Sequence, residues 1–293
     1  MPNPIYTTTN LNPTAYHLRY TWTGWPSSGL LPNPLLDNEQ EQLNEAWETD
    51  GLRVLAQNWT TNQVQFTFSV TPQISPVFFA ARAKGRLQHA LRLAGKSTKF
   101  SRKVAVRTIG DNTTQQVETY IRNQVKKEPL ADAEFRARLQ PFTTHDADVD
   151  LSKPTASNSG RYWYNLHLVL VVQGRLRFAD TESLGLLPQT CGRIAERKGY
   201  LLSAVSVLPD HVHLALRGNI EQSPEEIALA YLNNLAYVMK QNAVWQYGYY
   251  VGTFSEYNMN AVRSNKRNLR LTETDSLVTQ GDKGLNSVRA ATD

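Results

Sequence analysis

Two histidines stand two positions apart in the otherwise apolar stretch "LPDHVHLAL", residues 208–216. Side chains alternate between the two faces of a strand, so His211 and His213 would share one face while Val212 points to the other. Two neutral imidazoles placed in this way can share a divalent cation. The same spacing also fits two histidines on a strand that bind nothing, and the motif alone does not decide between these interpretations.

A second candidate is the stretch "TTQQVETYIRNQVKKE", residues 113–128, which predicts a helix capped by threonine. Val117 and Ile121 begin an apolar stripe with a spacing of four, and Tyr120 and Gln124 lie one above the other on an adjacent face. A phenol is a poor nucleophile unless the phenol or its target is activated, and a metal ion on a scissile phosphate would activate the target. Alternatively, Tyr120 is only the edge of the packing stripe.

A third candidate is a run of cations between residues 82 and 107 that contains no acid. Its members are Arg82, Lys84, Arg86, Arg92, Lys96, Lys99, Arg102, Lys103 and Arg107. A solvated helix face normally mixes both signs of charge, so this run predicts a polyanionic partner.

These residues belong to a sequence that repeats itself. The aligned stretches are 51–76 with 199–224 and 15–22 with 163–170, both at a separation of 148, and 106–117 with 251–262 at a separation of 145. Apolar alternation matches as well, since Val64 faces Val212 and Phe66 faces Leu214. The chain is therefore predicted to be a tandem duplication of one domain.

Each repeat is predicted to form a strand, a helix, two strands, a helix, a strand and a final helix. The order βαββαβ is typical of a ferredoxin-like unit, here with an appended helix. We therefore expect an α+β protein in which two such units form a pseudo-dimer. The expected boundaries are a first domain at 1–131, a short helix and flexible linker at 132–160, a second domain at 161–267 and a disordered tail at 268–293.

Composition limits the class of protein. Hydrophobic residues make up 41% of the 293 positions, enough for a sizeable core, and the net charge is +5. Cys191 is the single cysteine, which excludes an internal disulfide and favours a reducing cytoplasm. The sequence starts without a basic segment followed by an apolar one, and its longest apolar run is too short to cross a bilayer, so neither a secretory leader nor a membrane span is expected.

Together these motifs resemble the single-tyrosine, single-strand DNA transposases of the HUH (histidine–hydrophobe–histidine) class, which include the REP-associated tyrosine transposases. "PDHVHLAL" resembles their histidine motif, and "YIRNQ" at 120–124 resembles their catalytic helix. The resemblance implies Mg²⁺ or Mn²⁺ held by His211, His213 and Gln124, with Tyr120 attacking single-stranded DNA to form a 5′-phosphotyrosine. In many members two subunits share each site, one supplying the histidines and the other the tyrosine helix.

The two repeats depart from this pattern in opposite ways. Gln63 and Gln65 occupy the histidine positions of the first repeat, and Asn265 occupies the tyrosine position of the second. Each repeat therefore keeps the part that the other has lost. This complementary loss predicts one composite site, in which Tyr120 reaches across to the histidines of the second repeat, and one degenerate site.

The sequence thus predicts a metal-dependent enzyme of transposase type that nicks and joins single-stranded DNA. Its expected partner is single-stranded DNA with hairpin ends, and the pseudo-dimer is consistent with a monomer in solution. The main alternative is a domesticated, non-catalytic protein that binds DNA hairpins. A metal-dependent hydrolase unrelated to DNA would use the histidine pair but leaves Tyr120, the repeat and the cations unexplained.

Overall fold

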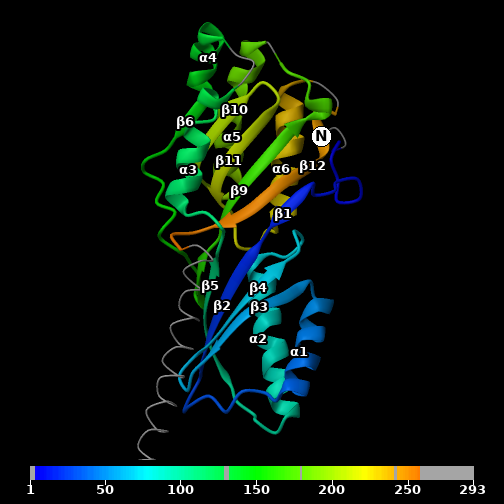
Figure 1. Cartoon of the computed structure of the whole chain (residues 1–293), viewed down its shortest axis with the longest axis vertical. Coiled ribbons are helices and arrows are strands. Elements are labelled where there is room, and N and C mark those ends of the chain that lie inside the picture. Colours follow the sequence, from blue (N-terminus) through cyan, green and yellow to red (C-terminus); the bar gives the residue numbers. More distant parts are fainter. Residues whose placement is uncertain (1–3, 129–131, 179, 241–242, 258–293) are drawn as a thin grey trace, which may run out of the picture.

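The computed structural model describes residues 4–128, 132–178, 180–240 and 243–257. Two six-stranded sheets lie one above the other along the long axis of the molecule (Figure 1). Sheet A has the strand order β1-β12-β9-β11-β10-β6, and sheet B has the order β3-β4-β2-β5-β8-β7. No helix in these ranges is both long and apolar enough to cross a membrane.

The first ferredoxin-like unit forms most of sheet B. Its elements are β2 (Arg19–Pro26), α1 (Asp37–Thr49), β3 (Leu52–Trp59), β4 (Val64–Val70), α2 (Pro76–Leu93) and β5 (Phe100–Thr108). Alternate side chains of β4 point towards the two helices, where Trp47 of α1 meets Phe66 and Phe68 edge-on at 5.0 Å between ring centroids. The aromatic core of this unit therefore lies between α1, α2 and one face of the sheet.

The second unit forms most of sheet A with the same order of elements. They are β9 (Asn165–Val172), α5 (Thr181–Lys198), β10 (Leu201–Leu208), β11 (His211–Arg217), α6 (Pro224–Val238) and β12 (Trp245–Phe254). The strand order β12-β9-β11-β10 matches β5-β2-β4-β3 strand for strand. The predicted α+β class with two ferredoxin-like units is confirmed.

The second helix of each unit begins in the same way. Ser75 and Ser223 are the N-caps of α2 and α6, and each side chain accepts a hydrogen bond from a backbone amide of the first turn. A proline follows each serine, where its missing N–H costs nothing. Both halves therefore encode this helix start with the same two residues.

Two short strands are exchanged between the units. β1 (Ala15–His17) pairs in parallel with β12 of sheet A, although the rest of its repeat lies in sheet B. Conversely, β8 (Gly160–Trp163) pairs in parallel with β5 of sheet B, with β7 (Thr155–Ala156) beyond it. Each sheet therefore contains strands from both repeats.

The strand pairing corrects one predicted alignment. Arg19 pairs with Ser69 in sheet B, and Asn165 pairs with Arg217 in sheet A. Because Ser69 and Arg217 are equivalent at a separation of 148, Arg19 corresponds to Asn165 at a separation of 146. The separation of 148 predicted for 15–22 is wrong, because a slip of two residues leaves every side chain on the same face and is invisible to apolar periodicity.

The segment between the repeats does more than connect them. It contains α4 (Ala133–Leu139) and β6 (Thr143–His145), and β6 pairs antiparallel with the outer edge of β10. This part of the expected flexible linker is therefore a strand that covers an edge of sheet A. Single turns of 3₁₀-helix complete the fold: η1 (Val125–Lys127), η2 (Gln140–Phe142) and η3 (Gln173–Arg175). The tail expected at 268–293 and Asn265 lie outside the described residues.

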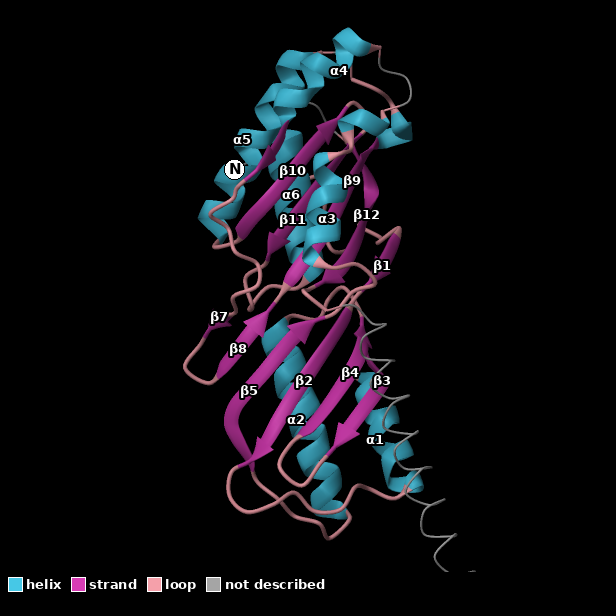
Figure 2. Cartoon of the chain, turned by 60° about the vertical axis from the view of Figure 1, so that its left-hand side comes forward, coloured by secondary structure: helices cyan, strands magenta, loops and turns pink. Residues whose placement is uncertain are grey.

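Helix α3 (Thr114–Arg122) follows β5 in sequence but lies on sheet A (Figure 2). The backbone passes close to β12 where it crosses from sheet B to sheet A, and Thr113 forms a β-bridge with Ser255, the residue after β12. A Cβ atom at Gly110 would lie 1.9 Å from the carbonyl oxygen of Thr253. Glycine therefore permits the close approach of the two backbones that directs α3 onto the other unit.

Candidate active site

Apolar contacts hold α3 on sheet A. Val117 and Ile121 are buried in a small cluster with Ala204, Ala215 and Phe254 of β10, β11 and β12. Alanine side chains on the sheet leave room for a helix to approach closely. The apolar stripe predicted from the sequence therefore packs against the second repeat, and this contact fixes the position of the neighbouring tyrosine.

Tyr120 lies beside the histidine pair. Its ring meets that of His213 edge-on, with 5.5 Å between centroids and an interplanar angle of 85°. His211 and His213 are neighbours on β11, with 4.8 Å between their centroids. Tyr120 is 42% exposed whereas His213 is 5% exposed, so the phenol can meet a ligand from solvent above a largely buried imidazole. The structure thus brings together the tyrosine of the first repeat and the histidines of the second.

Both histidines have a hydrogen-bond partner at Nδ1. His211 Nδ1 lies 2.6 Å from Oδ1 of Asp210, whose Oδ2 accepts from Arg175 at 3.2 Å. His213 Nδ1 lies 3.0 Å from Nε2 of His167 on β9. If Nδ1 carries the proton, Nε2 of each histidine is unprotonated and free to bind a metal ion. Metal-binding histidines are commonly oriented in this way, by a partner residue that accepts from the other ring nitrogen.

His167 is a member of the site that the sequence prediction missed. It stands alone in the apolar strand "NLHLVLVV", where a single histidine gives no spacing signal. Its ring stacks on His213 at 5.3 Å and meets Tyr120 edge-on at 5.9 Å. The corrected register supplies a signal that could have found it, because all three histidines are replaced in the other repeat. His167, His211 and His213 correspond to Thr21, Gln63 and Gln65.

The environment of His167 and His213 favours the neutral imidazole. Burial lowers the pKa of His167 to about 4. Burial, followed by the nearby His167, His211 and Arg175, places the pKa of His213 well below its usual value. A neutral imidazole is the form that binds a metal ion, so His213 is able to act as a ligand at neutral pH without first losing a proton.

The Gln124 side chain is buried, and it forms a hydrogen bond with the backbone of its own helical turn rather than with the histidines. Its Nε2 donates to the carbonyl oxygen of Tyr120 at 2.9 Å, and α3 has already ended at Arg122. In the described ranges Gln124 forms no hydrogen bond with His211 or His213. The amide oxygen is not used in this hydrogen bond and stays chemically suitable as a metal ligand.

The donor set fits a divalent cation only in part. Within the described residues, no group of three His, Cys, Asp or Glu side chains could hold a metal ion. His211 and His213 supply two nitrogen donors, and His167 is engaged with His213 rather than available as a third. The remaining positions would have to come from Gln124, water or a bound phosphate.

Lys127 lies on the outer side of the tyrosine. Its Nζ is 4.7 Å from the centroid of the Tyr120 ring. Lys126 and Lys127 line a surface depression with Tyr120 and with polar residues of α3, including Gln116 and Asn123. The exposed side of the tyrosine is therefore cationic, as a polyanionic substrate requires.

The cationic run predicted to bind DNA is divided between two faces of sheet B. Arg86 is paired with Asp50, the C-cap residue of α1, at 2.9 Å, and Lys96 is paired with Glu39 of α1 at 3.4 Å. The absence of acids from the run therefore does not mean that its charges are unpaired. Among the others, Arg107 projects from the sheet face opposite α1 and α2.

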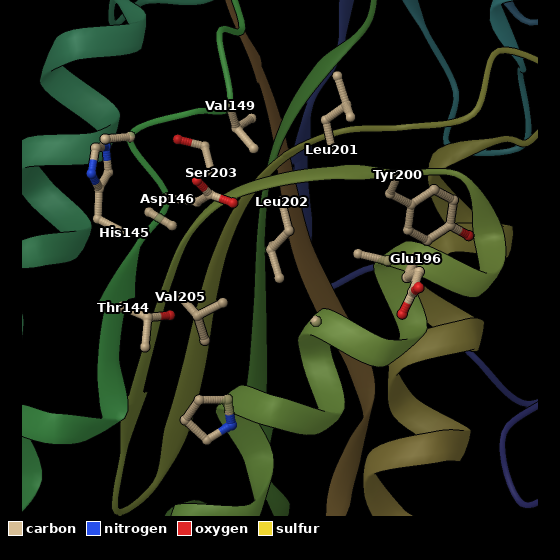
Figure 3. A pocket seen from close by; sticks show the side chains of 15 residues that line it. Thr144, His145, Asp146, Val149, Glu196, Tyr200, Leu201, Leu202, Ser203 and Val205 are labelled. Carbon is tan, nitrogen blue, oxygen red and sulfur yellow. The ribbon is translucent and has the colours of Figure 1, made fainter.

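A cavity of about 550 Å³, equal in volume to the depression beside Tyr120, lies away from the tyrosine and histidines (Figure 3). It opens between β6, β10 and α5, and its lining includes His145, Asp146, Glu196 and Tyr200. None of the predicted site residues lines it. We assign the candidate active site to Tyr120 and the histidines because their chemistry converges there.

Comparison with known proteins finds a family match in the second repeat. Residues 161–264 match the family model described as "Transposase IS200 like". The chain is similar to a candidate transposase from Deinococcus radiodurans R1, with 25% identity over 36% of this chain and 88% of that one and a TM-score of 0.30. It is also similar to the ligand-free regulatory subunit of aspartate kinase from Thermus thermophilus, with 12% identity over 76% and 92% of the chains and a TM-score of 0.19. Comparison with curated proteins gives no match. The family match confirms the resemblance for the repeat that carries His211 and His213.

Proposed function

We propose that this chain, whose residues 161–264 match the IS200-like transposases, nicks and rejoins single-stranded DNA at one composite site. The observation that carries the proposal is the edge-on contact between Tyr120 of the first repeat and His213 of the second. The other repeat has glutamines at the two motif-histidine positions, so among the described residues this constellation occurs once. The family match supports a transposase-type activity, and the contact between repeats supports the shared site.

His211 and His213 would hold a divalent cation, Mg²⁺ or Mn²⁺, through their Nε2 atoms, with Gln124 as a third ligand after its amide turns. When bound, the cation would polarise the scissile phosphate. Asp210 and His167 keep the two imidazoles in the required tautomer through Nδ1. The two residues that would orient the motif histidines thus come from strand β9 and from the turn before β11.

Tyr120 would be the nucleophile. Its Oη forms a bond to phosphorus while the bond to the 3′ oxygen breaks, and the phenolic proton is released as the 3′-hydroxyl is completed. The product is a 5′-phosphotyrosine and a free 3′-OH. A later attack by a 3′-OH on this link restores the phosphodiester and the phenol, so rejoining needs no external energy source. Lys127 would stabilise negative charge on the attacking oxygen and on the phosphate.

Incubation with 5′- and 3′-labelled single-stranded DNA and Mn²⁺ tests this proposal. We expect a covalent adduct that survives denaturation and carries only the label on the 3′ side of the nick. It should disappear in Tyr120→Phe and in His211→Ala. Tyr237→Phe is the matched control, since Tyr237 is an exposed tyrosine on α6 of the second repeat. An adduct that persists in Tyr120→Phe would assign the nucleophile to another residue, and DNA binding with no adduct would favour a non-catalytic hairpin-binding protein.

A further inference from the structure

Sheet B contains a cavity at the position that the candidate active site occupies in sheet A. It lies on the sheet face opposite α1 and α2 and has a volume of about 310 Å³. Its lining consists of Thr21, Thr23, Gln65, Thr67, Ala105, Arg107, Ile109, Trp163 and Tyr257. Gln65 is the counterpart of His213, and the corrected register makes Thr21 the counterpart of His167. The duplication has therefore left a cavity in place of the second histidine cluster.

The floor of this cavity is polar. Thr21 and Thr67 are cross-strand partners whose hydroxyl oxygens lie 3.0 Å apart, and Thr23 accepts a hydrogen bond from Nε2 of Gln65 at 3.1 Å. In sheet A the position of Thr67 is Ala215, which packs under α3. The floor therefore offers hydroxyl and amide groups for hydrogen bonds, where the equivalent surface of sheet A contributes an apolar contact.

The wall of the cavity combines a cation with two aromatic rings. The guanidinium of Arg107 lies 3.9 Å from the Trp163 ring centroid and 5.4 Å from that of Tyr257. Glu256 pairs with one of its nitrogens at 2.5 Å. Arginine has five N–H donors in a fixed plane, so this ion pair orients the group and leaves donors for a phosphate. Arg161, the cross-strand neighbour of Ala105, adds a second cation on this face.

We propose that this cavity binds one unstacked nucleotide of a single DNA strand without cutting it. The base would enter the cavity, pair its edge with Gln65 and the threonine hydroxyls, and stack on an aromatic wall, while Arg107 contacts its phosphate. Splayed-out bases are read in this way by stacking and edge hydrogen bonds, which a paired duplex cannot offer. The identity of the ligand as DNA rests on the proposed function, whereas the cavity and its chemistry do not.

Cleavage is not expected there. The imidazoles that would hold a cation are replaced by Thr21, Gln63 and Gln65. The cavity would instead anchor a DNA strand on sheet B, whereas Tyr120 lies on sheet A. The single cutting site would then act on DNA that is held at two points.

The test counts strands bound per chain in the full-length Tyr120→Phe protein, which cannot form the covalent adduct. Native mass spectrometry with the octanucleotides dT8 and dA8 should show two strands per chain, and Gln65→Glu should reduce this to one. Trp163→Leu should weaken the second event by about ten-fold, the effect of losing one stacking contact. Gln57→Glu is the matched control, because it makes the same charge change at an exposed position of the edge strand. Thermal melting verifies that each variant is folded.

Crosslinking assigns the position of the second strand. An octanucleotide with 5-iodouracil should crosslink to Trp163 or Tyr257, and a duplex of the same sequence should not. One strand per chain that is unaffected by Gln65→Glu, no bound strand, or crosslinks confined to α3 and β11 would each overturn the proposal. Adduct formation at Tyr120 is measured separately in the otherwise native chain with Gln57→Glu and should be retained. Loss of the adduct in the native chain would reject the proposed function and leave the strand count as an independent result.

Discussion

Nε2 of His167 lies 3.0 Å from Nδ1 of His213, so an unpredicted histidine on β9 orients a motif histidine on β11. The two rings stack at an interplanar angle of 20°, a contact that holds the plane of the His213 ring. Under the proposed function, the metal affinity of His211 and His213 would therefore depend on a residue outside the motif.

Replacement of His167 should weaken metal binding without removing a ligand. For His167→Phe we expect Mn²⁺ affinity to fall by about 10- to 100-fold, the usual cost of losing an orienting partner. His167→Gln keeps an acceptor near Nδ1 and should retain more of the affinity. Titration calorimetry and Mn²⁺ electron paramagnetic resonance measure this directly. Equal Mn²⁺ affinity in His167→Phe and the unaltered protein would contradict the positioning role.

Acid should destabilise the metal-free protein through the same histidines. An unfolded histidine has a pKa of about 6.5, and the folded pKa of His167 is about 4. Between these values the unfolded state binds more protons, so the free energy of unfolding falls as the pH is lowered from about 6.5 towards 4. The contribution of His167 should be about 1–3 kcal/mol, since the group is not fully shielded from solvent. Urea unfolding in EDTA at pH 7.5, 6 and 5 should show a shallower pH dependence for His167→Asn.

Gly110 should be intolerant of a side chain. Gly110→Ala places Cβ against the Thr253 carbonyl oxygen, and separating the two backbones should cost at least about 2 kcal/mol. Gly85→Ala is the matched control, because Gly85 lies within α2 and no atom lies within 4 Å of the position that its Cβ would take. That substitution should leave stability unchanged or raise it by about 0.5–1 kcal/mol. Similar melting temperatures for the two variants would show that the backbones at Gly110 and Thr253 can move apart at little cost.

Lys127 should affect the chemical step more than folding. Lys127→Met removes the cation beside Tyr120, and we expect adduct formation to slow by about ten-fold or more, in line with losing one electrostatic contact to developing charge. Lys127→Arg should retain part of the rate. Lys126→Met, a neighbour in the same depression, serves as the control for general loss of DNA attraction. If the single-turnover rate falls equally in both methionine variants, Lys127 acts only by attracting DNA and has no specific role in the chemical step.

Periodicity and self-similarity were sufficient to predict both ferredoxin-like units. The apolar stripe of α3 was also predicted, and Val117 and Ile121 are buried. Sequence could not show which surface receives the stripe, because that depends on where Gly110 directs the chain. The opposite losses in the two repeats supplied the missing information, since only a crossing helix brings Tyr120 to intact histidines.

Other features had no signal in the sequence. The exchange of β1 depends on parallel pairing between residues 15–17 and 250–252, a tertiary contact that local propensity does not encode. β6 is three residues of polar sequence, too short for alternation to be recognised. His167 was missed because a two-residue slip in β2 aligned it with Arg19 rather than with Thr21.

The exchanged strand β1 also sets an order of events during synthesis. Ala15 leaves the ribosome more than two hundred residues before its partner Tyr250. Tyr120 likewise leaves the ribosome before β11 exists, so the nascent chain carries a tyrosine without histidines for much of translation. The contact between Tyr120 and His213 can therefore form only after the second repeat has been synthesised, when α3 packs on sheet A.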